Sequence, residues 1–287
     1  MAGISGKDPT MEIDYQALDR AGTENYRTQA RKKIAYPGTE TVEWYGYTRH
    51  NFELDGHKGF IVEPPNPAPG LPWHWCTQWA EAFVPRTPAL KLLDRGFHHV
   101  YLDVFSTYLN AEGISILEKF YKMLMDMGFY PKGVLTGMSY GGLFAFRWAA
   151  EHPETVAAIY ADAPACDLGF SLPGGRLMSD MLKEHFTTEA AKRAAAYGVK
   201  EEELGSHPLS PLNNVKPIAE AKIPIFCIRS GQDQSVIPEE NIDVFAKRLK
   251  EAGGCIEILD RPLYGHHPHG LDDPQPLVDF ILRNYPF

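Results

Sequence analysis

The 287-residue sequence lacks several features that would place it in a specialised class of protein. No run approaches the roughly 18 consecutive apolar residues of a membrane-spanning helix, and residues 1–20 contain no continuous apolar segment typical of a secretory signal. The four cysteines have no C-x-x-C spacing, which argues against common zinc-binding patterns and small disulfide-rich frames. These absences predict a cytoplasmic, reduced protein. Cys227 lies inside the apolar run IPIFCIRS and is expected to be a small buried apolar residue.

Positive charge is also in short supply. Lys and Arg number 28 against 37 Asp and Glu, which gives a formal net charge of −9 and a pI near 5.7. Because binding to phosphates or anionic lipids needs a basic face, we expect no nucleic-acid and no membrane partner. The partner expected is a small-molecule substrate, and a homo-oligomer stays open. Hydrophobic residues make up 44% of the chain, enough for one large domain or a core with an inserted lobe.

Short apolar segments alternate with segments of helical period along most of the chain. Residues 41–63 predict two strands with a turn at Asp55-Gly56. Further strands are predicted at 98–105, 133–138, 155–164, 223–230 and 255–262, and helices at 86–95, 112–129, 141–152, 238–252 and 274–284. Strands that alternate with helices pair in parallel through crossover helices. The expected fold class is therefore α/β, with a mostly parallel sheet covered by helices on both faces.

Residues 165–222 interrupt this alternation. They contain helical stretches and polar turns but no strong strand signal between two clear strands. We expect an inserted helical cap over the strand ends, and an ordinary long crossover connection is the alternative. The core would then comprise residues 41–164 and 223–287, and residues 1–40 would form an N-terminal tail and leading segment.

The segment Gly137-Met138-Ser139-Tyr140-Gly141 matches the pattern G-x-S-x-G between a predicted strand and a predicted helix. A serine hydroxyl is a weak nucleophile, and a sharp turn lifts its side chain clear of the backbone toward a base. The flanking residues must be small because that turn brings the strand and the helix close together. The pattern predicts Ser139 as a nucleophile; a plain packed turn is the alternative.

The base is expected in the segment LYGHHPHGLDDP at 263–274, because it follows the last predicted strand. His266 directly follows a glycine and is the first choice, His269 the second and His267 the third. The alternative for a histidine-rich loop is metal binding, but no cysteine or glutamate cluster completes a site. We therefore expect no metal and no cofactor.

The acid should follow strand 223–230, where the chain reads SGQDQSVIPEEN. Asp233 fits, although the usual third position after Gly231 falls on Gln234, whose neutral side chain could not stabilise an imidazolium. Asp162 and Asp167, after strand 155–164, are reserves. The alternative role for Asp233 is that of a turn residue with a local side-chain hydrogen bond.

The segment WHWCTQW at 73–79 is interpreted as the loop after the third strand, and an oxyanion hole needs one backbone N–H from such a loop. The donors predicted are therefore Tyr140 and either Trp75 or Cys76. Tryptophan side chains near strand ends could also line a pocket for a sugar face or an aryl group. The candidates for that pocket are Trp73, Trp79 and Phe105, although at least one tryptophan of the segment is expected in the core.

The serine pattern, Asp233, GHHPHGL and the strand–helix order resemble the α/β-hydrolase superfamily over roughly residues 40–287. More narrowly, PWHWCTQWAEAF, GMSYGGL, AIYADAP and GHHPHGLDDP resemble bacterial esterase-like hydrolases near the dienelactone-hydrolase and acetyl-xylan-esterase types. The resemblance implies Ser139 as nucleophile, His266 as base and Asp233 as orienting acid. Cys76 and Tyr140 stand where that group often has arginine, so the polarity of the pocket stays open.

The function expected is that of a serine hydrolase that cleaves a carboxylic ester, such as a small carbohydrate or aryl ester, through an acyl-enzyme. One alternative is a peptidase of the prolyl-oligopeptidase kind, which would need a further N-terminal domain, for which residues 1–40 leave no room, or an acidic subsite for a free amine. Another is a non-catalytic binding protein of the same fold, which the irregularity at Gln234 favours. A dehalogenase would want Asp at the position of Ser139 and is disfavoured.

Overall fold

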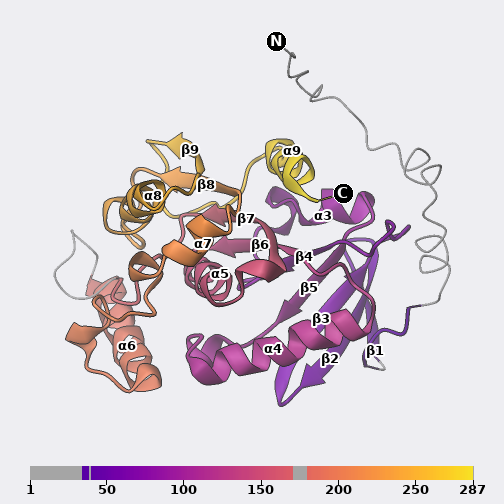
Figure 1. Ribbon diagram of the computed structural model, residues 1–287, viewed down its shortest axis with the longest axis horizontal. Coiled ribbons are helices and arrows are strands. Elements are labelled where there is room, and N and C mark those ends of the chain that lie inside the picture. The colour runs from indigo at the N-terminus through magenta and orange to yellow at the C-terminus, as the bar shows by residue number, and fades with distance from the viewer. Residues whose placement is uncertain (1–33, 39, 171–179, 287) are drawn as a thin grey trace, which may run out of the picture.

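The computed structural model describes residues 34–38, 40–170 and 180–286, with the side chains of 180–186 left out (Figure 1). Within these residues nine strands form one sheet, in the order β1-β2-β3-β5-β4-β6-β7-β8-β9. The strands are β1 (Glu40–Trp44), β2 (Tyr47–Leu54), β3 (His57–Glu63), β4 (Trp73–Cys76), β5 (His98–Leu102), β6 (Gly133–Met138), β7 (Val156–Asp162), β8 (Ile225–Ser230) and β9 (Glu257–Arg261).

The sheet has an antiparallel edge and a parallel body. Strands β1, β2, β3 and β5 pair antiparallel in that order, whereas each pair in the series β5-β4-β6-β7-β8-β9 is parallel. Parallel strands need crossover connections, and helices supply most of them. The expected α/β class with a mostly parallel sheet is confirmed.

Helices cover both faces of the sheet, and the core lies between these layers. They are α3 (Ala89–Asp94), α4 (Ala111–Asp126), α5 (Tyr140–Glu151), α6 (Asp180–Tyr197), α7 (Lys216–Glu220), α8 (Ile242–Glu251) and α9 (Gln275–Asn284). Val134 of β6 packs with α3 and α9, whereas the next residue, Leu135, packs in the cluster that contains α4, α5 and α8. Successive strand residues point to opposite faces, so this arrangement follows from the pleat. In Figure 1, α3 and α9 lie together, away from α4.

The sequence prediction for residues 41–63 is wrong in one respect, because three strands form there instead of two. A second turn at Tyr45-Gly46, with φ of 51° and 87°, precedes the expected turn at Asp55-Gly56. Four of the five residues of β1 are exposed. An exposed edge strand carries little of the alternating apolar pattern by which strands are recognised, so the sequence pattern does not separate β1 from β2.

The segment Trp73–Cys76 is not a loop but the central strand β4, paired on both sides. Trp73 and Trp75 are 0% and 1% exposed. The Trp73 indole N–H donates to the Tyr130 carbonyl at 2.7 Å, and the Trp75 ring packs edge-on against Phe120 and Trp148. Both tryptophans therefore belong to the core, and the prediction of Trp73 as a pocket residue is wrong.

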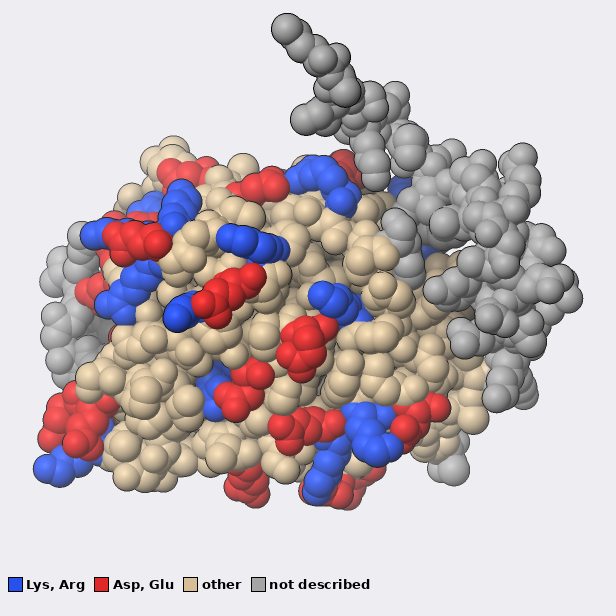
Figure 2. All heavy atoms as spheres, in the orientation of Figure 1, with Lys and Arg blue, Asp and Glu red and all other residues tan. Residues whose placement is uncertain are grey.

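The segment 165–222 lies between β7 and β8 and contains α6, α7 and short 3-10 turns, with no strand in its described part. Helix α7 packs against α5 of the core. Figure 1 shows α6 at one side of the molecule, beyond the end of the sheet. Among the described residues, no helix is both long and apolar enough to span a membrane. On the face drawn in Figure 2, basic and acidic side chains are interspersed.

Candidate active site

Ser139 stands at the sharp turn between β6 and α5. Its φ of 52° and ψ of −122° are strained for a residue with a side chain. The turn requires glycine around it. A Cβ on Gly137 would lie 2.7 Å from the Gly141 carbonyl oxygen, and one on Gly142 would lie 2.2 Å from the Pro164 Cβ. The glycines therefore let strand, helix and the chain after β7 approach closely enough to hold Ser139 in this conformation.

A continuous set of hydrogen bonds joins Ser139, His266 and Asp233, although 127 and 33 residues of sequence separate the successive partners. The His266 Nε2 lies 2.9 Å from the Ser139 Oγ, and the Nδ1 lies 2.6 Å from the Asp233 Oδ2. Because Nδ1 faces a carboxylate, the proton of the neutral ring belongs there, which leaves the Nε2 lone pair directed at the serine hydroxyl. An arrangement of this kind lets the ring take the proton of the hydroxyl while the carboxylate orients the ring.

Asp233 fills both roles that the sequence left open. Its Oδ2 meets His266, whereas its Oδ1 accepts from the backbone N–H groups of Ser235 and Val236 at 2.8 and 2.9 Å. The side chain is 1% exposed, and Gln234 is exposed. The local turn therefore fixes the carboxylate that orients the ring, and the one-residue offset of Asp233 does not prevent contact with His266.

The reserve residues lie in other places. Asp162 is fully buried and meets the Nδ1 of His269 at 2.9 Å through Oδ1, while Oδ2 accepts from the Tyr160 hydroxyl and the Gly270 N–H, each at 2.7 Å. Asp162 therefore fastens the histidine loop to the end of β7. Asp167 accepts from Ser210 and Gly169. Neither aspartate meets His266 in the described structure.

His267 is exposed, and its ring stacks on Phe83 with a centroid distance of 5.4 Å and an interplanar angle of 25°. Partial desolvation of the ring by its neighbours lowers its pKa below 6.5, and the imidazoles of His266 and His269 act in the same direction. The ring centroids of these three histidines lie 4.8–5.0 Å apart. The loop thus brings three imidazoles together, one of them hydrogen-bonded to Ser139.

Only part of the predicted oxyanion hole fits the structure. Tyr140 is the first residue of α5, so its N–H has no acceptor within the helix. Trp75 and Cys76 are wrong, because both lie in the paired strand β4, and the next N–H, that of Thr77, donates to Thr136. The next backbone amide along the chain, that of Gln78, lies close to the start of α5. Its nitrogen would be 3.4 Å from a Cβ atom added to Gly141. In the described part of the chain Gln78 N–H has no acceptor, so it replaces Trp75 and Cys76 as the second donor candidate.

Residues 117–285 match the model of the prolyl oligopeptidase family, Peptidase_S9, which covers more than half of the chain. The chain belongs to this family. The match contains Ser139, Asp233 and His266. No curated protein matches the chain. Family and fold together place the chain in the α/β-hydrolase superfamily, and the narrower esterase types suggested by the sequence are not confirmed.

Solved structures of low identity share the fold. A protein assigned as a dipeptidyl aminopeptidase IV from Bacteroides ovatus has a TM-score of 0.63 at 16% identity, over 87% of this chain and 37% of its own. The acylaminoacyl peptidase of Pyrococcus horikoshii gives 0.56 at 17%, over 79% and 38%. A protein assigned as a lipase from Acinetobacter baumannii gives 0.50 at 13%, over 97% and 98%. This chain therefore spans less than two-fifths of the two peptidases and nearly all of the third protein.

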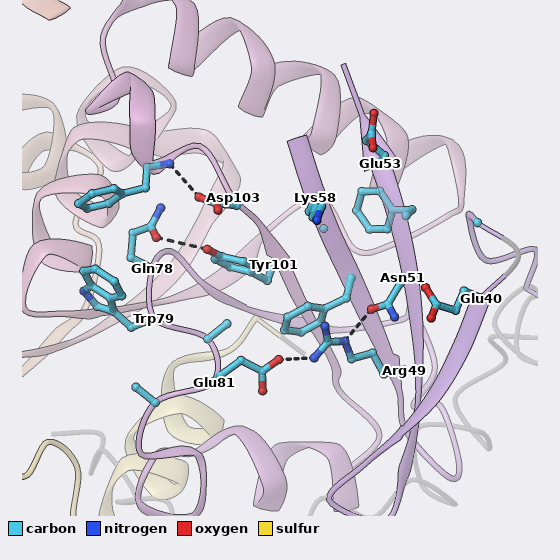
Figure 3. Close-up of a pocket in the computed structure, with 17 residues that line it drawn as sticks. Glu40, Arg49, Asn51, Glu53, Lys58, Gln78, Trp79, Glu81, Tyr101 and Asp103 are labelled. Carbon is cyan, nitrogen blue, oxygen red and sulfur yellow. Dashed lines mark hydrogen bonds and ion pairs between the residues drawn. The ribbon is translucent and has the colours of Figure 1, made fainter. Parts of the chain in front are cut away.

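Beside the turn at Ser139, this member of the prolyl oligopeptidase family has a group of aromatic rings. The Phe105 ring lies 5.3 Å from that of Trp79 and 5.1 Å from that of Tyr140, and Trp79 is 42% exposed. Trp79 and Phe105 line one end of a cavity of about 1030 Å³ whose other wall is the outer part of the sheet (Figure 3). Ser139 and His266 are not among its lining residues. The cavity adjoins the site through lining residues that lie near Tyr140 and Gly141, namely Gln78, Trp79 and Phe105.

Arg193 of α6 is a site neighbour that the sequence did not single out. It is fully buried, and its guanidinium donates to the Tyr140 hydroxyl at 2.6 Å and to the carbonyls of Leu168 and Phe170. Burial raises the pKa of Tyr140 despite this cation, so the phenol stays neutral. The Ala-rich stretch around Arg193 has no residue spacing that predicts a contact with the turn at Ser139, so only the three-dimensional structure reveals it.

Proposed function

We propose that this chain hydrolyses carboxylic esters through an acyl-enzyme, with Ser139 as nucleophile, His266 as general base and Asp233 as orienting acid. The observation that carries the proposal is the unbroken hydrogen-bond series from Ser139 Oγ through His266 to Asp233, at 2.9 and 2.6 Å. A base within about 2.6–3.2 Å of the hydroxyl is close enough to take its proton as attack proceeds.

The first half-reaction forms the acyl-enzyme and releases the alcohol. Ser139 Oγ attacks the ester carbonyl carbon while its proton passes to His266 Nε2, and the carbonyl oxygen becomes an oxyanion. The N–H groups of Tyr140 and Gln78 are the proposed donors to that oxyanion. The tetrahedral species then collapses, the bond to the alkoxy group breaks, and His266 Nε2 returns the proton to the leaving alcohol.

Deacylation repeats these steps with water. His266 takes a proton from the water, whose oxygen attacks the acyl carbon, and the Ser139 oxygen leaves with the proton that the ring returns. Asp233 keeps the ring in the tautomer with Nδ1–H and stabilises the imidazolium while it carries two protons. The buried carboxylate and its two backbone donors support this role.

An aryl or small carbohydrate group is the substrate feature that the surroundings favour. Trp79 presents an exposed indole beside Phe105, and an aromatic face of this kind stacks on flat apolar groups and on sugar faces. The segment 165–222 would roof the site as a cap, and the contacts of Arg193 with Tyr140 and of Glu189 with Tyr108 support this arrangement.

A panel of p-nitrophenyl and aryl esters tests the proposal, with acetylated sugars as a second arm. We expect turnover of the short aryl esters, and loss of that turnover in Ser139→Ala. The variant Ser206→Ala serves as a control, because Ser206 is an exposed serine of the segment 165–222. An absence of turnover with every ester, or full turnover in Ser139→Ala, contradicts the proposal.

A small peptidase is the second candidate, and two observations favour it. The family is that of the prolyl oligopeptidases, and acidic side chains, among them Glu53, Glu81 and Asp103, line the cavity next to Trp79. Carboxylates in a subsite could hold the free amine of a peptide. Aminoacyl p-nitroanilides decide between the candidates, since a peptidase with an amine subsite would cleave them with a higher kcat/KM than their N-acetylated counterparts, whereas an esterase would cleave esters but no anilide. A non-catalytic binding protein would cleave neither.

A further inference from the structure

Two of the three clustered histidines are arranged as metal ligands usually are. His266 and His269 each direct Nδ1 at a buried carboxylate, that of Asp233 at 2.6 Å and that of Asp162 at 2.9 Å. A carboxylate on one ring nitrogen holds the proton there and makes the other nitrogen a better electron donor. In both rings that other nitrogen is Nε2.

The Nε2 of His269 needs a partner. The side chain is 3% exposed, and this nitrogen is buried without a hydrogen bond to any residue that the structure describes. Leaving a buried polar atom unpaired is energetically unfavourable, and such an atom calls for a physical explanation. A bound ion supplies one, because a neutral imidazole with its lone pair on Nε2 is a metal ligand.

His267 completes a set of three. One ligand nitrogen from each of His266, His267 and His269 lies within 4.8 Å of one from each of the others. Three nitrogens around a tetrahedral zinc ion lie about 3.3 Å apart for Zn–N bonds of about 2.0–2.1 Å. A movement of one to two ångströms therefore suffices, and the ring that has most room to make it is the exposed one, His267.

We propose that His266, His267 and His269 bind a zinc ion, and that this ion inhibits the enzyme. Imidazole suits Zn²⁺, and three histidines with one water give it four ligands. The ion would take the Nε2 lone pair of His266 that otherwise faces the Ser139 hydroxyl. The binding stands on the three rings alone, whereas the inhibition rests on the proposed function.

Charges around the loop are balanced enough to accept a dication. The carboxylates of Asp162 and Asp233 lie directly behind two of the rings. Two cations lie close to the loop among the described residues: Arg261, whose guanidinium is 3.5 Å from Asp162, and Arg86, which donates to the His269 carbonyl. These two cations face the carboxylate and the backbone, so their charges are partly compensated there.

The test of binding uses the full chain without any substrate. Zn²⁺ is titrated calorimetrically, and Co²⁺ replaces it for visible absorption, whose intensity reports four-coordinate geometry. We expect one ion per chain, and affinity at least tenfold weaker in His267→Phe, which keeps the ring on Phe83 and removes its nitrogens. The control His57→Phe alters a histidine of β3 outside the cluster and should bind as the parent does.

The test of inhibition follows the aryl-ester activity against free Zn²⁺. We expect Zn²⁺ to abolish turnover of the parent chain, a chelator to restore it, and His267→Phe to need at least tenfold more Zn²⁺ for half inhibition. Unaltered affinity in His267→Phe, or no bound ion at all, overturns the metal site. If the ion binds through His267 but no ester or amide is ever cleaved, the proposed function fails while the metal site stands.

Discussion

Two aspartate–histidine pairs lie side by side at the ends of β7, β8 and β9, and they differ in what meets the far side of the imidazole. In the pair Asp233–His266, Nε2 faces Ser139 Oγ at 2.9 Å and the histidine side chain is 14% exposed. In the pair Asp162–His269, Nε2 has no hydrogen-bond partner in the described structure and the side chain is 3% exposed. Of the two pairs, only Asp233–His266 has a serine hydroxyl on the far side of the ring and a partly solvent-exposed imidazole.

The comparison shows that a carboxylate behind a histidine does not by itself make a catalytic base. Asp162 is saturated by donors from Tyr160, His269 and Gly270, with Arg261 close by, so its pair holds a loop in place. Asp233 uses one oxygen for its own turn and one for the ring. The pair Asp162–His269 stabilises the fold around the site, and the pair Asp233–His266 serves the chemistry that we propose.

Replacing the two histidines one at a time should give the largest contrast. We expect His266→Ala to lower kcat by roughly 10⁴-fold or more, because the base that activates Ser139 is removed, with little change in unfolding temperature. His269→Ala should instead lower stability and leave a measurable kcat in the folded fraction. Steady-state kinetics with thermal unfolding of both variants checks this, and equal kcat losses would contradict the distinction.

Replacing the two aspartates should give the same contrast between a loss of kcat and a loss of stability. Asp233→Asn removes the carboxylate that fixes the tautomer and should lower kcat by roughly 10⁴-fold while the fold persists. Asp162→Asn leaves buried donors without their charged acceptor and should cost about 3–5 kcal/mol of unfolding free energy. Urea titrations and kcat values measured together decide the matter. A greater stability loss in Asp233→Asn than in Asp162→Asn would reverse our assignment.

Histidines that lack a carboxylate extend the comparison to pH. Burial lowers the pKa of His98 and His99 from 6.5 to about 3, and that of His74 lies well below 6.5 for the same reason. Below pH 6.5 the unfolded chain therefore binds more protons than the folded one. The contribution of these three histidines to the free energy of unfolding should be constant above pH 6.5. It should fall as the pH drops from 6.5 toward 3.

His99→Phe provides the check on that pH dependence. It removes one of these groups and should reduce the slope between pH 6 and 4 by about 1.4 kcal/mol per pH unit. Urea unfolding at several pH values measures the slope. An identical slope in the variant and the parent would show that His99 is not held neutral by the fold.

The smallest effect is expected from Tyr160→Phe. This variant deletes the hydroxyl that donates to Asp162 at 2.7 Å and keeps the buried ring. A hydrogen bond to a charged group contributes about 1.5–3 kcal/mol, so the loss of stability should fall in that range with kcat unchanged. A large fall in kcat with no loss of stability would mean that the pair Asp162–His269 takes part in the chemistry.

The sequence located the parts of the site that rest on local patterns. The glycines around Ser139, the turn at Asp233 and the loop carrying His266 each leave a short signature, because the backbone there has few sequences that fit it. The fold class followed from the alternation of strands and helices. These features needed no knowledge of which strands are neighbours.

The predictions are wrong where the structure of a segment depends on which strands and helices lie next to it in three dimensions. Trp73–Cys76 is a four-residue central strand buried on both faces, so it shows no alternation of apolar and polar residues, and its sequence resembles an aromatic loop. The oxyanion residues Trp75 and Cys76 and the pocket residue Trp73 were wrong for that one reason. Arg193 contacts Tyr140 across a sequence separation of 53 residues, and no local sequence pattern predicts this contact.

The most direct test of the central claim is labelling of the full chain with a fluorophosphonate, followed by peptide mass spectrometry. Our account predicts one phosphonylated residue, Ser139, with labelling lost in His266→Ala and kept in His269→Ala wherever that variant folds. Labelling of another serine, or undiminished labelling of Ser139 without His266, would contradict it.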